Sequence, residues 1–173
     1  MAPRTEIEAF RAFLDPLQQV LSCVCNSVLL STGYRSQSQP HGITLSGDPA
    51  VLRGRHGLGL TVFHYYRLVV SESAWRVQTT GYRYALRDAS GREVLAYHWH
   101  PTGVSPITFP HLHAGPAAEV GFAPFAQAHL PTRRLAIEEI LQLAITDFSV
   151  VPLRGDWRRI LAVTMAERDE HVD

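Results

Sequence analysis

The chain contains no lysine, so all sixteen of its basic residues are arginine. Sixteen acidic residues balance them, and the formal net charge is zero. This balance excludes a bulk electrostatic attraction to nucleic acid or to an anionic membrane surface. The arginine bias is typical of a GC-rich coding sequence. It also means that every cation of the chain can make bidentate contacts to phosphate or carboxylate.

Cysteine is scarce, and long apolar runs are absent. Cys23 and Cys25, the two cysteines, match neither a Cys-x-x-Cys motif nor a disulfide framework. The longest apolar run, at about residues 20–30, is interrupted by polar side chains and is too short to cross a bilayer. The first ten residues are polar and acidic, unlike a signal peptide. We therefore expect a soluble, cytoplasmic protein that makes no contact with a membrane.

The apolar content is sufficient for one hydrophobic core. The 173 residues are 46% hydrophobic and 18% charged, which is typical of a globular domain. Neither an internal repeat nor a linker divides the sequence. We predict a single α+β domain over residues 1–165, followed by a charged, mobile tail over residues 166–173.

Two helix-start signals lie near the N-terminus. Thr5 and Glu8 form a capping-box pattern, which predicts a helix that begins just after Thr5. Asp15 followed by Pro16 repeats the start signal, and it predicts a kink or a restart of the helix. Apolar residues continue at three- and four-residue spacing beyond this point. The pattern predicts a long amphipathic element that ends near residues 31–33.

The middle of the chain carries the strand signals. Residues 33–56 are rich in Gly, Ser and Pro, which predicts a loop or irregular hairpin with a short strand near residues 43–45. Three longer strands follow, and a hairpin loop at Asp88–Gly91 joins the second to the third. These strands are expected at residues 58–70, 75–86 and 92–100.

The hairpin loop sets the register of the second and third strands, and alternation then divides their side chains between two faces. One face is apolar and aromatic, as expected of a core face. The other face is mixed and places arginines beside histidines. The first carries Tyr82, Tyr84, Leu86, Leu95, Tyr97 and Trp99, and the second carries Arg83, Ala85, Arg87, Val94, Ala96, His98 and His100.

A further helix is expected in the C-terminal half of the chain. Thr132 is an N-cap candidate for a helix over residues 133–148, and Glu138 and Glu139 are expected to face solvent. The elements together predict an α+β fold: a mainly antiparallel sheet of four to five strands, flanked by the N-terminal helix and by this one. The remaining expected elements are a short strand at 109–114, a loop at 115–131 and a final strand or short helix at 160–165.

Four of the nine histidines form two His-x-His pairs. His98 pairs with His100, and His111 pairs with His113. Residues two apart on a strand point to the same face, so each pair presents two imidazoles together. Imidazole changes most easily between proton donor, proton acceptor and metal ligand near neutral pH. We place the candidate site here, and His64 is a further candidate if it reaches the same face as His98.

One chemistry that fits these histidines is metal binding. Imidazoles from neighbouring strands can hold zinc or another divalent ion. The candidate ligands are His98, His100, His111 and His113.

Metal-free RNA cleavage is the other chemistry that fits. It needs a base, an acid and a cation that stabilises the phosphorane. His98, His111 and His113 are the candidate acid and base residues, and Arg83 is the candidate phosphate clamp. Tyr97 is a candidate donor or stacking platform. This interpretation requires no cofactor, and a purely structural role for the histidines stays open beside it.

The segment around these histidines has a recognisable order of features. A Tyr-x-Tyr strand is followed by an acidic turn with Gly, a third strand, a Phe-Pro-His-x-His motif and a helix. This order, over about residues 60–150, resembles the TumE-type toxins, small bacterial proteins found beside a DNA-binding antitoxin. The chain has residues 96–100 where that family carries Arg-x-Asp-Asn. The matching residues are Tyr82, Tyr84, Asp88, Gly91, Tyr97, Phe109, Pro110, His111, His113 and the helix after Thr132.

The resemblance implies a toxin of a toxin–antitoxin pair that inhibits growth by acting as a ribonuclease. It also implies a cognate antitoxin protein and RNA as partners, and a homodimer is a further assembly to test. Two other functions stay open from the residues alone. One is a non-catalytic domain whose sheet face or 115–131 loop binds a protein. The other is a metal-dependent enzyme that uses the same histidines.

Overall fold

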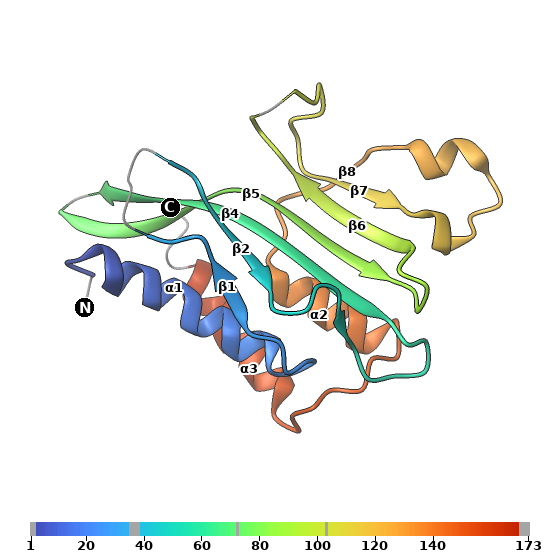
Figure 1. Cartoon of the computed structure of the whole chain (residues 1–173), viewed down its shortest axis with the longest axis horizontal. Coiled ribbons are helices and arrows are strands. Elements are labelled where there is room, and N and C mark those ends of the chain that lie inside the picture. Colours follow the sequence, from blue (N-terminus) through green and yellow to red (C-terminus); the bar gives the residue numbers. More distant parts are fainter. Residues whose placement is uncertain (1–2, 35–38, 72, 103, 170–173) are drawn as a thin grey trace.

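A computed structural model describes residues 3–34, 39–71, 73–102 and 104–169. It shows an α+β fold, with a mostly antiparallel sheet and an N-terminal and two C-terminal helices, as predicted (Figure 1). The elements are α1 (Glu6–Leu21), β1 (Leu29–Ser31), β2 (His41–Leu45), β3 (Ala50–Val51), β4 (Gly59–Ser71), β5 (Ala74–Arg87), β6 (Glu93–Trp99), β7 (His111–Ala114), the 3₁₀ turns η1 (Pro116–Ala118) and η2 (Ala123–Gln127), β8 (Leu130–Pro131), α2 (Ile137–Thr146) and α3 (Trp157–Asp169).

The sheet has eight strands, more than the four to five expected from the sequence. Its order is β1-β2-β4-β5-β6-β7-β8, and β3 pairs with β4 beside this path. The additional strands are β1, β3 and β8, which are two to three residues long, whereas β7 lies within the short strand expected at residues 109–114. Segments this short carry too little alternation to be recognised in a sequence.

The predicted register of β5 and β6 is confirmed. Tyr82 lies opposite Trp99, and Tyr84 lies opposite Tyr97. The turn between the strands is held by Asp88, whose carboxylate accepts hydrogen bonds from the backbone N–H groups of Ser90 and Arg92. The turn therefore fixes which side chains of β5 and β6 share a face.

Helices α1, α2 and α3 gather on one side of the sheet (Figure 1). The aromatic residues of β5 and β6 pack against them in one core cluster, which includes Tyr82, Tyr84 and Trp99 together with Leu21 of α1 and Ile140 of α2. The opposite side of the strands carries Arg83, Ala96 and His98. We call this side the outer face.

The predicted end of the N-terminal helix is wrong. Helix α1 continues through Pro16 without a restart, but it ends at Leu21 instead of near residues 31–33. The side chain of Gln18 accepts from the N–H of Leu29 at 2.8 Å and donates to the carbonyl of Ser27 at 3.0 Å. These bonds hold the reversed chain against the helix, so that residues 29–31 form strand β1. Apolar spacing at the end of the helix was compatible with either structure.

The predicted start of the second long helix is also wrong, because α2 begins at Ile137 instead of near residue 133. The backbone N–H of Ala136 donates to the Glu139 carboxylate at 2.9 Å. The N–H of Thr132 instead donates to the Pro110 carbonyl and extends the sheet. The helix is therefore capped by Glu139 of its own first turn and not by Thr132.

Glu138 is fully buried, contrary to the expected solvent-facing position.

The remaining predicted segments have more structure than expected. The 115–131 loop contains η1, η2 and β8, and residues 160–165 lie within helix α3. The predicted tail begins inside this helix, since residues 166–169 belong to α3 and residues 170–173 lie outside the described part of the chain. Among the described helices, none has the length and apolar character needed to cross a membrane.

Candidate metal centre

Strands β6, β7 and β8 bring four histidines onto the outer face. His98 of β6 lies directly opposite His111 of β7, and Ala96 lies opposite His113. Leu130 of β8 pairs with Leu112, so the preceding residue, His129, falls beside His113. Because cross-strand neighbours on one face lie close together, antiparallel pairing alone gathers these imidazoles.

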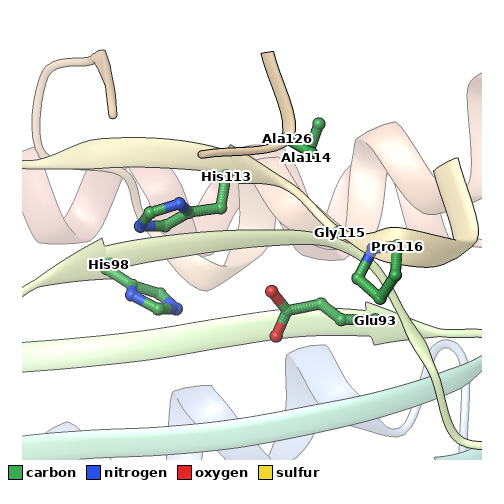
Figure 2. Close-up of a pocket in the computed structure, with 7 residues that line it drawn as sticks. All are labelled: Glu93, His98, His113, Ala114, Gly115, Pro116 and Ala126. Carbon is green, nitrogen blue, oxygen red and sulfur yellow. The ribbon is translucent and has the colours of Figure 1, made fainter. Parts of the chain in front are cut away.

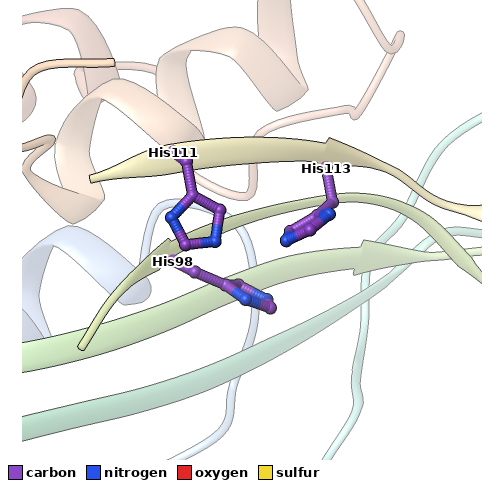
Figure 3. A group of neighbouring side chains, drawn as sticks. All are labelled: His98, His111 and His113. Carbon is purple, nitrogen blue, oxygen red and sulfur yellow. The ribbon is translucent and has the colours of Figure 1, made fainter. Parts of the chain in front are cut away.

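His98, His111 and His113 form a compact trio. One ring nitrogen from each lies within 4.8 Å of the others. The ring centroids are 5.4 Å apart for His98 and His111, 4.9 Å for His98 and His113, and 4.8 Å for His111 and His113. Figure 3 shows the three rings close together on the same face of β6 and β7. We call these three residues the histidine trio.

The tautomer of His111 is set by a backbone contact. His111 is only 4% exposed, and its Nδ1 lies 2.8 Å from the carbonyl oxygen of Phe109. A carbonyl oxygen can only accept, so Nδ1 carries the proton. The lone pair of the neutral ring is then on Nε2. This arrangement, with one nitrogen bonded to a carbonyl and the other left as a donor of electrons, is the usual one for a metal-binding histidine.

Arg83 links the trio to an acidic residue. Its Nε donates to Nε2 of His98 at 3.3 Å, and its Nη2 donates to the Glu93 carboxylate at 2.7 Å. The bond to His98 is long for an N–H···N contact, whereas the bond to Glu93 is short and charge-assisted. Glu93 therefore holds the guanidinium beside His98 and keeps its charge partly neutralised.

His98 and His113 are held in their neutral form. Burial, followed by the charges of His113, Arg83 and His111, lowers the pKa of His98 to about 3. Burial, followed by the charge of His129, lowers the pKa of His113 below its usual range. Protonating one ring is opposed by the others because their charges would repel. At neutral pH both rings thus present lone pairs, which is the form that binds metal.

An open groove of about 450 Å³ runs beside the trio. It is lined by Glu93, His98, His113, Gly115 and Ala126 among others, and the Glu93 carboxylate points toward the His98 ring (Figure 2). Gly115 is required here, because a Cβ atom at this position would lie 2.1 Å from the Glu93 carbonyl oxygen. Because Gly115 has no Cβ atom, η1 can approach β6 closely, and this approach shapes one end of the groove.

The structure brings together most of the predicted site residues. His98, His111, His113 and Arg83 share the outer face. Tyr97 lies on the opposite face, facing Tyr84, and so does not reach the other predicted catalytic residues.

His100 and His64 are not members of the trio. The ring of His100 lies 5.8 Å from that of His98, near Tyr65, and the group with metal-ligand spacing does not include it. The expectation that His64 could share the face of His98 is wrong. His64 pairs with Tyr82 on the core side, where its ring nitrogens contact the Tyr84 hydroxyl at 2.6 Å and the Thr79 hydroxyl at 3.1 Å.

Sequence reasoning missed His129 and Glu93. The ring of His129 lies 4.4 Å from that of His113 and 5.0 Å from that of His111. His129 lies in residues 115–131, which the composition predicted to be a loop. Leu130 and Pro131 gave no alternation that could reveal strand β8, which is the element that brings His129 to the others.

The donor set of the trio fits a divalent transition metal. Imidazole nitrogens suit zinc, copper, nickel and cobalt. A tetrahedral zinc with Zn–N bonds of about 2.0–2.1 Å needs its nitrogens roughly 3.3 Å apart. The nitrogens of the trio lie within 4.8 Å of one another, so binding an ion requires the rings to move closer together. The contact from Arg83 to His98 is the one that metal binding at His98 Nε2 would replace.

Comparisons with protein families, with curated proteins and with solved structures found no match to this chain. The arrangement of the described residues is therefore the basis for a functional proposal.

Proposed function

We propose that the protein is a metal-dependent hydrolase whose divalent ion, zinc in the first instance, is held by the histidine trio. The observation that carries this proposal is the convergence of three imidazole nitrogens within 4.8 Å. The Phe109 carbonyl supports it, because it leaves Nε2 of His111 as the free nitrogen. Three neutral nitrogen ligands and an open position are typical of catalytic zinc sites.

The groove gives the site an approach for substrate. A divalent ion in such a site acidifies a water molecule and polarises the bond to be cleaved. Glu93, His98 and His113 line the groove, and Arg83 contacts His98 and Glu93. The described geometry therefore offers a carboxylate and a guanidinium next to the position that a substrate would occupy.

Arg83 favours an anionic substrate. A guanidinium has five N–H donors, and the bonds to His98 and Glu93 use two of them. The remaining donors match the oxygens of a phosphate in geometry and charge. We therefore propose phosphoesters as the substrate class, with RNA as the first substrate to assay.

Metal-free ribonuclease activity of a toxin is the second candidate, because Arg83 and the trio are brought together as that mechanism needs. This mechanism needs a protonated side chain as the general acid, and the described histidines support that role poorly. His98 and His113 have lowered pKa values and are neutral at pH 7, so neither is a ready proton donor. The resemblance to TumE-type toxins, the antitoxin partner and a homodimer stay predictions. A non-catalytic protein-binding role of the sheet face or of residues 115–131 also stays a prediction.

Elemental analysis of the purified chain tests the proposal. The protein should be prepared without a histidine tag, beside His111→Ala and a control, His56→Ala, which removes an exposed imidazole away from the trio. We expect about one equivalent of zinc or a similar ion in the unaltered chain and in the control, and a loss of most of it in His111→Ala. An unaltered chain that neither retains metal nor binds added zinc would overturn the proposal.

A further inference from the structure

His129 extends the row of imidazoles beyond the trio. Its ring lies 4.4 Å from His113, which is closer than any ring-to-ring distance within the trio itself. Unlike the buried His111, it is exposed. The His129 imidazole makes no hydrogen bond within the described part of the chain, so nothing there competes for its lone pair.

His129 lies between a paired strand and an exposed turn. After it, Leu130 and Pro131 pair with β7 and fix the position of its backbone. Before it, η2 is a short 3₁₀ turn whose residues are exposed. Side-chain rotation at an exposed position is fast and unhindered. The imidazole of His129 can therefore turn toward the trio or away from it while the strand stays in place.

We infer that His129 is a fourth, exchangeable ligand of the centre, and that it competes with substrate for the open coordination position. This inference rests on the proposed metal site. With His129 bound, four imidazoles surround the ion and no position is free. With His129 turned away, the ion keeps its three ligands and the fourth position faces the groove. A closed, four-ligand zinc site is typical of tight structural binding, and an open one is typical of catalysis.

The position of His129 explains why it, and not His100, takes this role. His100 lies 5.8 Å from His98, and its ring contacts Tyr65. His129 lies beside two members of the trio at once, His111 and His113. Neither His129 nor His100 belongs to the group with metal-ligand spacing, so the His129 ring has to turn from its present position to reach an ion held by its two neighbours.

X-ray absorption at the zinc edge tests the inference directly. Four variants of the untagged chain are compared with the unaltered protein: His129→Ala, His129→Cys, Gln127→Cys and His111→Ala. A thiolate ligand gives a Zn–S shell at about 2.3 Å, clearly separated from Zn–N at about 2.0–2.1 Å. We expect the sulfur shell in His129→Cys. Gln127→Cys, the matched control on the same exposed segment, should show none.

Zinc affinity, measured with a competing chelator, gives the second readout. We expect His129→Ala to keep one equivalent of zinc but to bind it about tenfold to 100-fold more weakly, a loss of the size caused by weakening a ligand shell. No sulfur shell in His129→Cys, with unchanged affinity in His129→Ala, would overturn the role of His129 while leaving the trio intact. Failure of the unaltered chain to bind zinc would instead overturn the proposed function itself.

Discussion

Nε of Arg83 donates a hydrogen bond to Nε2 of His98 at 3.3 Å, and Nη2 of the same guanidinium donates to the Glu93 carboxylate. The bond occupies the lone pair that His98 would offer to a metal through Nε2. It is the weaker of the two bonds that Arg83 makes, since the bond to Glu93 is 2.7 Å long and joins opposite charges. In the proposed metal centre, metal binding would therefore exchange a weak contact of His98 for a ligand bond and leave Arg83 anchored by Glu93.

Replacing Arg83 separates its two roles. In Arg83→Gln we expect zinc affinity to be retained or increased, because the competing donor on His98 Nε2 is lost. Turnover of a phosphoester should fall, because the planar guanidinium no longer meets the phosphate. Zinc titration and phosphoester assays on the same sample measure both effects. If Arg83→Gln lost zinc binding while remaining folded, the exchange described for His98 would be wrong.

The stability of the metal-free protein should depend on pH through His98. Its pKa is about 3 in the folded chain and about 6.5 when unfolded, so the unfolded chain binds more protons between these values. The contribution of His98 is fully present above pH 6.5 and is lost as the pH falls toward 3. The slope is at most about 1.4 kcal/mol per pH unit, reduced by solvent screening because the ring is only partly buried.

Chemical denaturation between pH 7.5 and pH 5, with a chelator present, measures this slope. His98→Gln should flatten it, since Gln does not titrate. A slope in His98→Gln equal to that of the unaltered chain would show that other groups cause the dependence.

Gly115 should be intolerant of a side chain. Its Cβ would meet the Glu93 carbonyl oxygen at 2.1 Å, so Gly115→Ala forces η1 away from β6. We expect a loss of about 1–3 kcal/mol of unfolding free energy, typical of overpacking, and weaker metal binding because the groove is distorted. Gly121→Ala is the control, since nothing lies within 4 Å of its added Cβ. Equal stability of the two variants would contradict the close approach of η1.

The core side of the sheet should be independent of the metal centre. His64 Nδ1 and the Tyr84 hydroxyl are 2.6 Å apart and buried on that side. Tyr84→Phe leaves a buried polar group short of one partner, and we expect a cost of about 1–3 kcal/mol in unfolding free energy. Zinc affinity of the folded variant, measured by titration, should stay unchanged. A change in affinity would mean that the two faces are coupled.

The sequence was informative where the side-chain pattern was long and a turn fixed the register. The Asp88 turn and the alternation of β5 and β6 predicted that Arg83 and His98 share a face, and they do. The same alternation placed Tyr97 on the other face, where the structure has it. Here local rules of strand geometry decide the arrangement, so tertiary contacts were not needed for the prediction.

Prediction was poorer where tertiary contacts decide the structure. The end of α1 depends on the hydrogen bonds that Gln18 donates to the carbonyl of Ser27 and accepts from the N–H of Leu29, which the apolar spacing of the helix does not reveal. The burial of Glu138 depends on how α2 packs. His129 joins the cluster only because two residues of β8 pair with β7. Each of these features needs a contact between segments whose pairing cannot be read from periodicity.

Zinc titration of the chelator-treated, untagged protein by calorimetry tests the central claim most directly. The unaltered chain and His56→Ala should bind one zinc ion per chain, and His98→Ala, His111→Ala and His113→Ala should each bind it at least about tenfold more weakly. Folding of each variant is checked by circular dichroism. If all three bound zinc as the unaltered chain does, or if the unaltered chain bound none, the histidine trio would not be a metal centre.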